Sequence, residues 1–215
     1  MNRTEYIPER NAGLRRFLGT AWVYQAFQSL VISRRARQWI VSDHIRPAAG
    51  MIVVDVGCGP ARLRTQLPPD LEYFGFDPNP DYIKTARRTA NGTFSVGTIK
   101  DFIQANGKAL AGRVDLVTCM GVLHHVSSES MDEILTAARC LLRPGGRFVA
   151  IEPVFLACQD AASRWVLRQD RGTSILNDVE WRELLDRHFP RAQVRVTTHL
   201  LRIPYTHALL TGWAD

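Results

Sequence analysis

Hydrophobic and polar positions in the middle of the chain form short apolar runs separated by longer amphipathic stretches. The apolar runs predict five strands, at 52–56, 73–76, 93–96, 114–119 and 147–151. A run such as Met51-Ile52-Val53-Val54 is typical of a parallel strand that is covered on both faces. The stretches NPDYIKTARRTA, from Asn79, and ESMDEILTAARCLL, from Glu129, predict helices. This alternation predicts an α/β fold with a doubly wound sheet.

Two regions lie outside that alternation. Residues 1–46 are predicted to be mainly helical and are interpreted as a lid segment ahead of the main domain, 47–215. Residues 153–177 are long for a connection, and a helix is expected through QDAASRWVLRQD. Because long connections at this end of an α/β sheet are often functional, they are interpreted as a substrate-side insertion. A further helix, DVEWRELLDRHF, precedes AQVRVTTH and RIPYTHALLTGW, which predict an antiparallel strand pair.

The loop after the first predicted strand has the composition of a ligand site. Gly57 and Gly59 allow a tight turn and a close approach of a ligand to the backbone. A dinucleotide fingerprint would need a third glycine where this chain has Arg62. Asp55, just before the glycines, is a poor neighbour for pyrophosphate and suits a cationic ligand. An NAD-dependent oxidoreductase is therefore the weaker of two enzyme hypotheses.

Asp77 closes the second predicted strand. A carboxylate at this position can accept hydrogen bonds from both hydroxyls of a ribose. The alternative is that Asp77 only caps the helix that begins near Asn79.

Four motifs carry a family resemblance. VVDVGCGPARL, GFDPNPDYIKTARR, VDLVTCMGVLHHV and LLRPGGRFVAIEP lie in this order and resemble the motifs of class I S-adenosylmethionine-dependent methyltransferases of the small, single-domain kind. The resemblance covers about residues 45 to 153. It implies a Rossmann-like seven-stranded sheet in the order 3-2-1-4-5-7-6, with the last strand antiparallel, and S-adenosylmethionine as cofactor.

The resemblance also implies roles for single residues. Asp55 would receive the amino group of the cofactor and Asp77 its ribose, while Met120 would lie near the sulfonium. The other positions expected at the cofactor are Gly57, Cys58 and Gly59 at the methionine moiety, Pro78 beside the adenine, and Tyr24 on an N-terminal helix that folds over the site.

One position departs from the family pattern. After the third strand the family usually has Gly-Asp, and the aspartate binds the adenine amino group, whereas this chain has Gly97-Thr98-Ile99. Thr98 offers only a hydroxyl, so the contact could pass to the backbone at Thr98 and Ile99 or to Asp101. The departure also leaves open the hypothesis that the protein is a regulator that binds the cofactor without catalysing a reaction.

His124 and His125 are the candidate catalytic residues. Histidine titrates near neutral pH, so either ring could take a proton from an attacking hydroxyl or amine. The alternative is structural packing at the start of the next helix. Two adjacent histidines without further ligands do not indicate a metal site. Tyr205 and His207 could reach the substrate pocket from the last strand.

Composition narrows the partners. The formal charge of +6 comes mainly from scattered arginines, and only Arg34 to Arg37 form a cluster, so nucleic-acid binding is not favoured. Four separate cysteines without a Cys-x-x-Cys pair fit a reducing cytoplasm. The apolar run 17–32 is shorter than the roughly 18 residues of a membrane span and is interpreted as an amphipathic helix. The expected acceptor is a small metabolite, methylated on oxygen, nitrogen or carbon; the sequence leaves the oligomeric state open.

Overall fold

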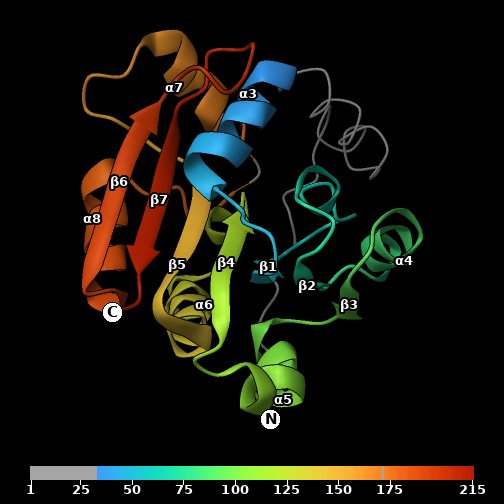
Figure 1. Ribbon diagram of the computed structural model, residues 1–215. Coiled ribbons are helices and arrows are strands. Elements are labelled where there is room, and N and C mark those ends of the chain that lie inside the picture. Colours follow the sequence, from blue (N-terminus) through green and yellow to red (C-terminus); the bar gives the residue numbers. More distant parts are fainter. Residues whose placement is uncertain (1–32, 171) are drawn as a thin grey trace.

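A computed structural model describes residues 33–170 and 172–215. Seven strands form one sheet in the order β3-β2-β1-β4-β5-β7-β6 (Figure 1). Neighbouring strands are parallel except where β7 pairs antiparallel with β5 and with β6. The predicted strand order and the antiparallel last strand are confirmed. The strands are β1 Ile52–Val56, β2 Glu72–Asp77, β3 Thr93–Val96, β4 Val114–Met120, β5 Leu142–Pro153, β6 Arg191–Thr197 and β7 His207–Trp213.

The predicted helices are also found in this structure. Asn79 caps α4 by accepting from the backbone N–H of Asp81, and Ser127 caps α6 by accepting from that of Ser130. The α-helices are α3 Arg34–Trp39, α4 Pro80–Thr89, α5 Ile99–Leu110, α6 Ser128–Leu141, α7 Ala161–Arg168 and α8 Asp178–His188. Shorter turns are the π-helix η1 Ile40–Ile45 and the 3-10 helices η2 Arg64–Gln66 and η3 Leu123–His125.

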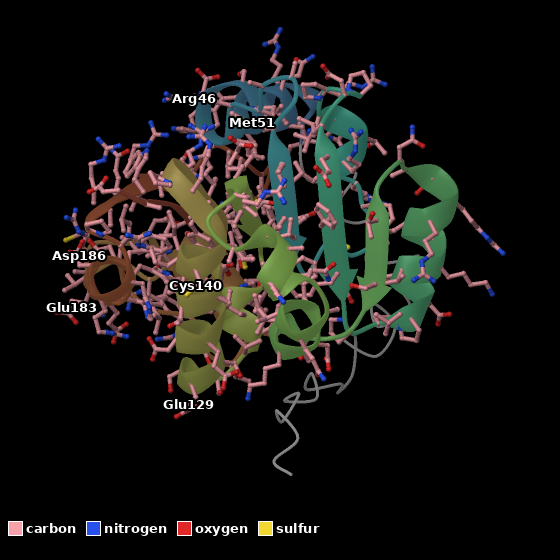
Figure 2. The ribbon with its side chains drawn as sticks, turned by 60° about the horizontal axis from the view of Figure 1, so that its bottom comes forward. Arg46, Met51, Glu129, Cys140, Glu183 and Asp186 are labelled. Carbon is pink, nitrogen blue, oxygen red and sulfur yellow. The ribbon has the colours of Figure 1, made fainter. Side chains whose placement is uncertain are left out.

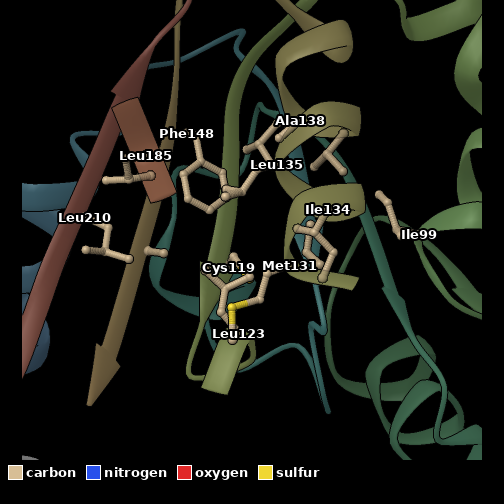
Figure 3. Packing of buried hydrophobic residues seen from close by; sticks show 14 of the residues in the cluster. Ile99, Cys119, Leu123, Met131, Ile134, Leu135, Ala138, Phe148, Leu185 and Leu210 are labelled. Atoms are coloured by element: carbon tan, nitrogen blue, oxygen red, sulfur yellow. The ribbon is translucent and has the colours of Figure 1, made fainter. Parts of the chain in front are cut away.

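Helices cover both faces of the sheet. On one face, α5, α6 and α8 pack on Val54 and Phe148; Leu135 of α6 lies beside Phe148 in Figure 3. On the other face, η1 and α4 pack on Val53 and Val149. Adjacent residues of one strand therefore enter opposite cores, as expected for strands buried on both sides.

Strand β5 begins earlier than predicted. Helix α6 ends at Leu141, and the chain enters the sheet at Leu142, which pairs with Val114, whereas the next pair is Leu116 with Arg147. Residues 143–146 form the resulting irregularity. A Cβ on Gly146 would lie 2.9 Å from the carbonyl oxygens of both Arg143 and Val114, so a glycine is needed there.

The connection from β1 to β2 contains no α-helix. Its regular structure is η2, and the buried side chain of Arg64 fixes it by donating to the carbonyl oxygens of Asn91, Pro68 and Pro69. In a dinucleotide-binding sheet, the pyrophosphate lies at the N-terminus of a helix in this connection. The absence of such a helix argues against the oxidoreductase hypothesis.

The described part of the N-terminal segment is packed into the core. Ile45 is fully buried, Nε2 of His44 lies 3.1 Å from the carbonyl oxygen of Ala150, and Ala36 packs with Leu200 and Leu209. Residues 1–32, which make up most of the predicted lid 1–46 and include Tyr24 and the apolar run, lie outside the described residues. Within the described ranges, no helix is long and apolar enough to cross a membrane.

Candidate active site

The carboxyl ends of β1, β2, β4 and β5 meet at one edge of the sheet, where ligands bind in α/β folds. Figure 2 shows this polarity: Met51, just before β1, and Glu129, at the start of α6, lie at opposite ends of the molecule. Gly57 follows β1 with a φ of 63°. A Cβ there would lie 2.6 Å from Cγ2 of Val122, so glycine lets the loop after β1 pass close to the segment after β4.

Asp77 connects the loops that follow β1 and β2. Its Oδ2 accepts from the backbone N–H of Gly59 at 3.0 Å, and its Oδ1 accepts from that of Asn79 at 2.8 Å. The helix cap itself is Asn79, so the alternative that Asp77 only caps α4 does not hold. Burial raises the pKa of Asp77. Each carboxylate oxygen can accept a further hydrogen bond, so ribose binding by Asp77 stays a prediction.

Asp55 lies inside the sheet. Its Oδ1 accepts from the hydroxyl of Thr118 at 2.6 Å, and its Oδ2 accepts from that of Tyr73. Burial raises the pKa of Asp55 to about 6, although both hydrogen bonds oppose the shift. The carboxyl group thus has partners of its own, and its effect on the cofactor amino group stays a prediction. Cys58 is buried and the pKa of its thiol is raised, so it packs as a small apolar residue.

Thr98 begins α5 as part of a capping box. Its backbone N–H and its hydroxyl both donate to Oδ2 of Asp101 at 2.8 Å. The side chain of Ile99 is buried in the core beneath α5, so only its backbone could serve the cofactor. Pro78 is exposed and Met120 is half-buried.

A second group of polar residues surrounds His124, just after β4. Nδ1 of His124 lies 2.5 Å from Oε2 of Glu152, and Nε2 lies 3.4 Å from Oδ1 of Asp170. Glu152 is fully buried at the end of β5, where its Oε1 accepts from the backbone N–H groups of Val122 and Leu123 at 3.0 Å. The imidazole is therefore held between two carboxylates.

Asp170 lies just past α7, in the predicted insertion. Its Oδ2 accepts from the hydroxyl of Tyr205 at 2.6 Å, and its Oδ1 accepts from the backbone N–H of Gly172 at 2.8 Å. The ring of Tyr205 packs on that of His207 with centroids 4.7 Å apart. Glu152, His124, Asp170 and Tyr205 thus form a continuous chain of contacts across four segments.

The charges in this chain of contacts are coupled. Burial favours neutral His124, but the negative charge of Glu152 and hydrogen bonds to both carboxylates outweigh it and raise the pKa of His124 to about 9. Burial also opposes ionisation of Asp170, yet the hydrogen bonds from His124 and Tyr205 hold its pKa well below the usual range. Burial lowers the pKa of His207 to about 4. One cation between two anions leaves a net charge of −1 near neutral pH.

His124, His125 and Asp170 are also the described residues that come nearest to a metal-binding group, with potential ligand atoms within 4.8 Å of one another. The geometry favours a proton over a metal ion. Both nitrogens of His124 already face carboxylates, and the ring of His125 packs against that of His124 at a tilt of 40°, with centroids 3.9 Å apart. Imidazoles that share a metal instead direct their in-plane lone pairs at one point.

The two histidines were predicted from the sequence, whereas two of the carboxyl groups around them were not. Glu152 could have been noticed as a single charge at the end of the apolar strand FVAIEP. Asp170 had no such signal, because it is one of several charged residues in an irregular segment. Tyr205 was expected near the substrate pocket, and the structure joins it to Asp170.

The fold is the one shared by class I S-adenosylmethionine-dependent methyltransferases, and part of the sequence matches a methyltransferase family. Residues 53–146 match the family described as "Methyltransferase domain". The ubiquinone biosynthesis O-methyltransferase of Pectobacterium carotovorum is 29% identical over 108 residues, which are 49% of this chain and 44% of that protein. The enzyme of the same name from Methylobacterium is 33% identical over 110 residues, 48% and 41% of the two chains. The chain thus matches less than half the length of these relatives.

Solved structures share the fold at low sequence identity. A phosphoethanolamine N-methyltransferase of Haemonchus contortus, in complex with phosphomonomethylethanolamine and S-adenosylhomocysteine, aligns with a TM-score of 0.69, 12% identity and coverage of 94% and 59% of the two chains. A methyltransferase of Archaeoglobus fulgidus aligns with a TM-score of 0.65, 13% identity and coverage of 87% and 93%. These similarities support the methyltransferase interpretation over the oxidoreductase.

Proposed function

We propose that the enzyme methylates a hydroxyl oxygen of a small metabolite and that His124 accepts the proton. The observation that carries the proposal is the ring of His124, held between Glu152 and Asp170 beside the carboxyl end of β4. The curated relatives named above are O-methyltransferases, which supports oxygen as the nucleophile.

The chemistry requires a proton acceptor. The sulfonium of the donor already activates its methyl group, so the protein mainly aligns donor and nucleophile. As the oxygen–methyl bond forms and the sulfur–methyl bond breaks, the hydroxyl proton passes to Nε2 of His124 in the fraction of the protein whose ring is neutral. Because the pKa of His124 is about 9, this fraction is small near pH 7 and grows as the pH rises. The methyl acceptor takes the place of Asp170 at Nε2 of His124. It can do so because the 3.4 Å contact between Nε2 and Asp170 is longer than a good hydrogen bond.

The net negative charge of His124 with Glu152 and Asp170 favours transfer of the hydroxyl proton to the protein. A free phenolate or alkoxide would be repelled by Glu152 and Asp170, whereas a proton is attracted to them. His125, whose ring packs against that of His124, is proposed to orient the methyl acceptor rather than to take the proton.

Nitrogen is the second candidate nucleophile. The same negative charge suits a protonated amine, and a structure with this fold is an N-methyltransferase. Methyl-labelled S-adenosylmethionine offered with a catechol and with a matched phenylethylamine distinguishes the two. Label transferred only to the amine would refute the oxygen assignment, and label transferred to neither after screening a fractionated cell extract would favour the silent regulator.

The assignments at the cofactor are part of the proposal. Asp77 binds the ribose, Pro78 flanks the adenine, and the backbone at Thr98 and Ile99 meets the adenine edge. Asp55 and Met120 act at the amino group and the sulfonium, while Gly57, Cys58 and Gly59 surround the methionine moiety. Calorimetry with S-adenosylhomocysteine on alanine variants of the side chains tests each role.

Residues 1–32 are proposed to close the site, with Tyr24 against the cofactor. Lids of this kind exclude water and complete a substrate pocket. Cutting the chain before Ser33 should leave a folded protein that binds S-adenosylhomocysteine more weakly and no longer turns over. Normal turnover by the shortened chain would refute the lid. A cytoplasmic location is proposed on the four separate cysteines, which are all free.

A further inference from the structure

The substrate-side insertion, residues 153–177, encloses His124 more closely than a loop that merely passes nearby. The backbone N–H of Ser174 donates to the carbonyl oxygen of His124 at 3.1 Å. A Cβ on Gly172 would overlap Cδ2 of the imidazole and lie 2.9 Å from that carbonyl oxygen. Asp170 faces Nε2 from the same segment. Three residues of the insertion thus meet His124: Asp170 and Gly172 lie at its ring, and Ser174 binds its backbone.

The carboxylate of Asp170 is fixed independently of the histidine. Tyr205 donates to one oxygen from the segment before β7, and Gly172 donates to the other. The neighbouring Thr206 fixes the insertion again, because its hydroxyl lies 2.8 Å from Oγ of buried Ser163 on α7 and accepts from Nε2 of Gln159 at 2.8 Å. Asp170 is therefore held beside the imidazole by residues other than His124.

We propose that Asp170, held by Tyr205 and Gly172, is a positioning residue that fixes the ring of His124 and sets how tightly Nε2 holds its proton. The proposal rests on the role of His124 in the proposed function and extends it to the insertion. Glu152 alone would fix the ring at Nδ1 and leave Nε2 open to the acceptor. With Asp170 opposite, the proton on Nε2 has a fixed partner until an acceptor replaces it.

The charged and titratable groups around His124 come from several elements. In the described part of the chain they are Glu152 of β5, Asp170 after α7, His125 of η3, Tyr205 just before β7, and His207 at its start. Glu152 and Asp170 carry the negative charge that favours a proton on the ring. His207 is neutral near pH 7, since its pKa is about 4, so it adds no opposing charge.

The direct test is NMR titration of the histidine rings in 15N-histidine-labelled full-length protein, with His124 assigned from the spectrum of His124→Gln. We expect His124 to titrate near pH 9 in the natural chain. Asp170→Asn removes the charge and should lower this pKa by at least about one unit, tenfold in proton affinity, and Asp170→Glu should restore most of it. Asp132→Asn is the matched control, because Asp132 also pairs with a histidine, His188, at 2.6 Å outside the site. It should leave His124 unchanged.

Two further readouts complete the test. Tyr205→Phe keeps the charge of Asp170 but removes its anchor, so the pKa of His124 should move less than in Asp170→Asn, while kcat should fall several-fold with little change in KM. The pH of half-maximal kcat/KM should follow the NMR value in each variant. An Asp170→Asn protein whose His124 titrates within about 0.3 unit of the natural chain overturns the proposal. The titration needs no acceptor, so it stands even where the O-methylation proposal fails.

Discussion

The cofactor side and the acceptor side of this site are built in different ways. The cofactor side comes from β1, β2 and the loops after them, and each of its residues lies in a short motif that can be recognised along the chain. The acceptor side joins His124, Glu152, Asp170 and Tyr205 from four segments, and its insertion lies beyond the family match at 53–146. The family match therefore contains the proposed cofactor side and His124, and it ends before Glu152, Asp170 and Tyr205.

The largest effect on stability is expected at Glu152, the fully buried residue of the acceptor side. Glu152→Ala would leave the imidazolium and three backbone N–H groups without their partner. The N–H groups are those of Leu123 and His124, which are buried, and of Val122, which is partly buried. Breaking a buried charge pair from one side costs about 3–5 kcal/mol of unfolding free energy. Urea unfolding measures it. A loss below about 1 kcal/mol would mean that Glu152 does not hold the acceptor side together.

On the cofactor side, Asp55 should make stability depend on pH. Its pKa is raised to about 6, so the folded protein favours the protonated acid, and stability is lost as the pH rises from about 4 through 6. Compared with Asp55→Asn, the natural chain should lose about 3 kcal/mol over this range. Unfolding curves of both proteins at pH 4 and pH 7 measure the difference. If the free energies of unfolding of the two proteins changed equally between pH 4 and pH 7, the raised pKa of Asp55 would be refuted.

Asp77→Ala separates binding from folding on the same side. It should weaken S-adenosylhomocysteine binding by about 1.5–3 kcal/mol, the worth of hydrogen bonds to a charged group, and leave the protein folded. Calorimetry measures the affinity, and Asp81→Ala, on the exposed first turn of α4, is the matched control. Equal affinities for the two variants would remove Asp77 from the ribose site.

The smallest effect is expected at Thr98, the position that departs from the family pattern. Thr98→Ala removes a cap from α5 and should cost about 1 kcal/mol of stability. Because the hydroxyl of Thr98 already donates to Asp101, cofactor affinity should change little. A fall in affinity much larger than the fall in stability would show that the Thr98 hydroxyl, and not the backbone, contacts the adenine.

The sequence was sufficient for the sheet and the cofactor edge for a physical reason. Buried parallel strands read as continuous apolar runs, and the turn at Gly57 and Gly59 needs residues without a Cβ or with positive φ. The sequence could not show which residues contact the side chains of these motifs. That Tyr73 and Thr118 hold Asp55 depends on strand register, and that Asp170 meets His124 depends on how the insertion folds back. Contacts between distant segments leave no local pattern.

The two sides of the site are proposed to have separate functions: one binds the cofactor and the other removes the proton. The most direct test measures S-adenosylhomocysteine affinity and methyl transfer on the same sample of His124→Gln. The account predicts an affinity within about twofold of the natural chain and a turnover lowered about 10²–10⁴-fold, the range of general base catalysis. Turnover close to that of the natural chain, or affinity lost in proportion to turnover, would contradict it.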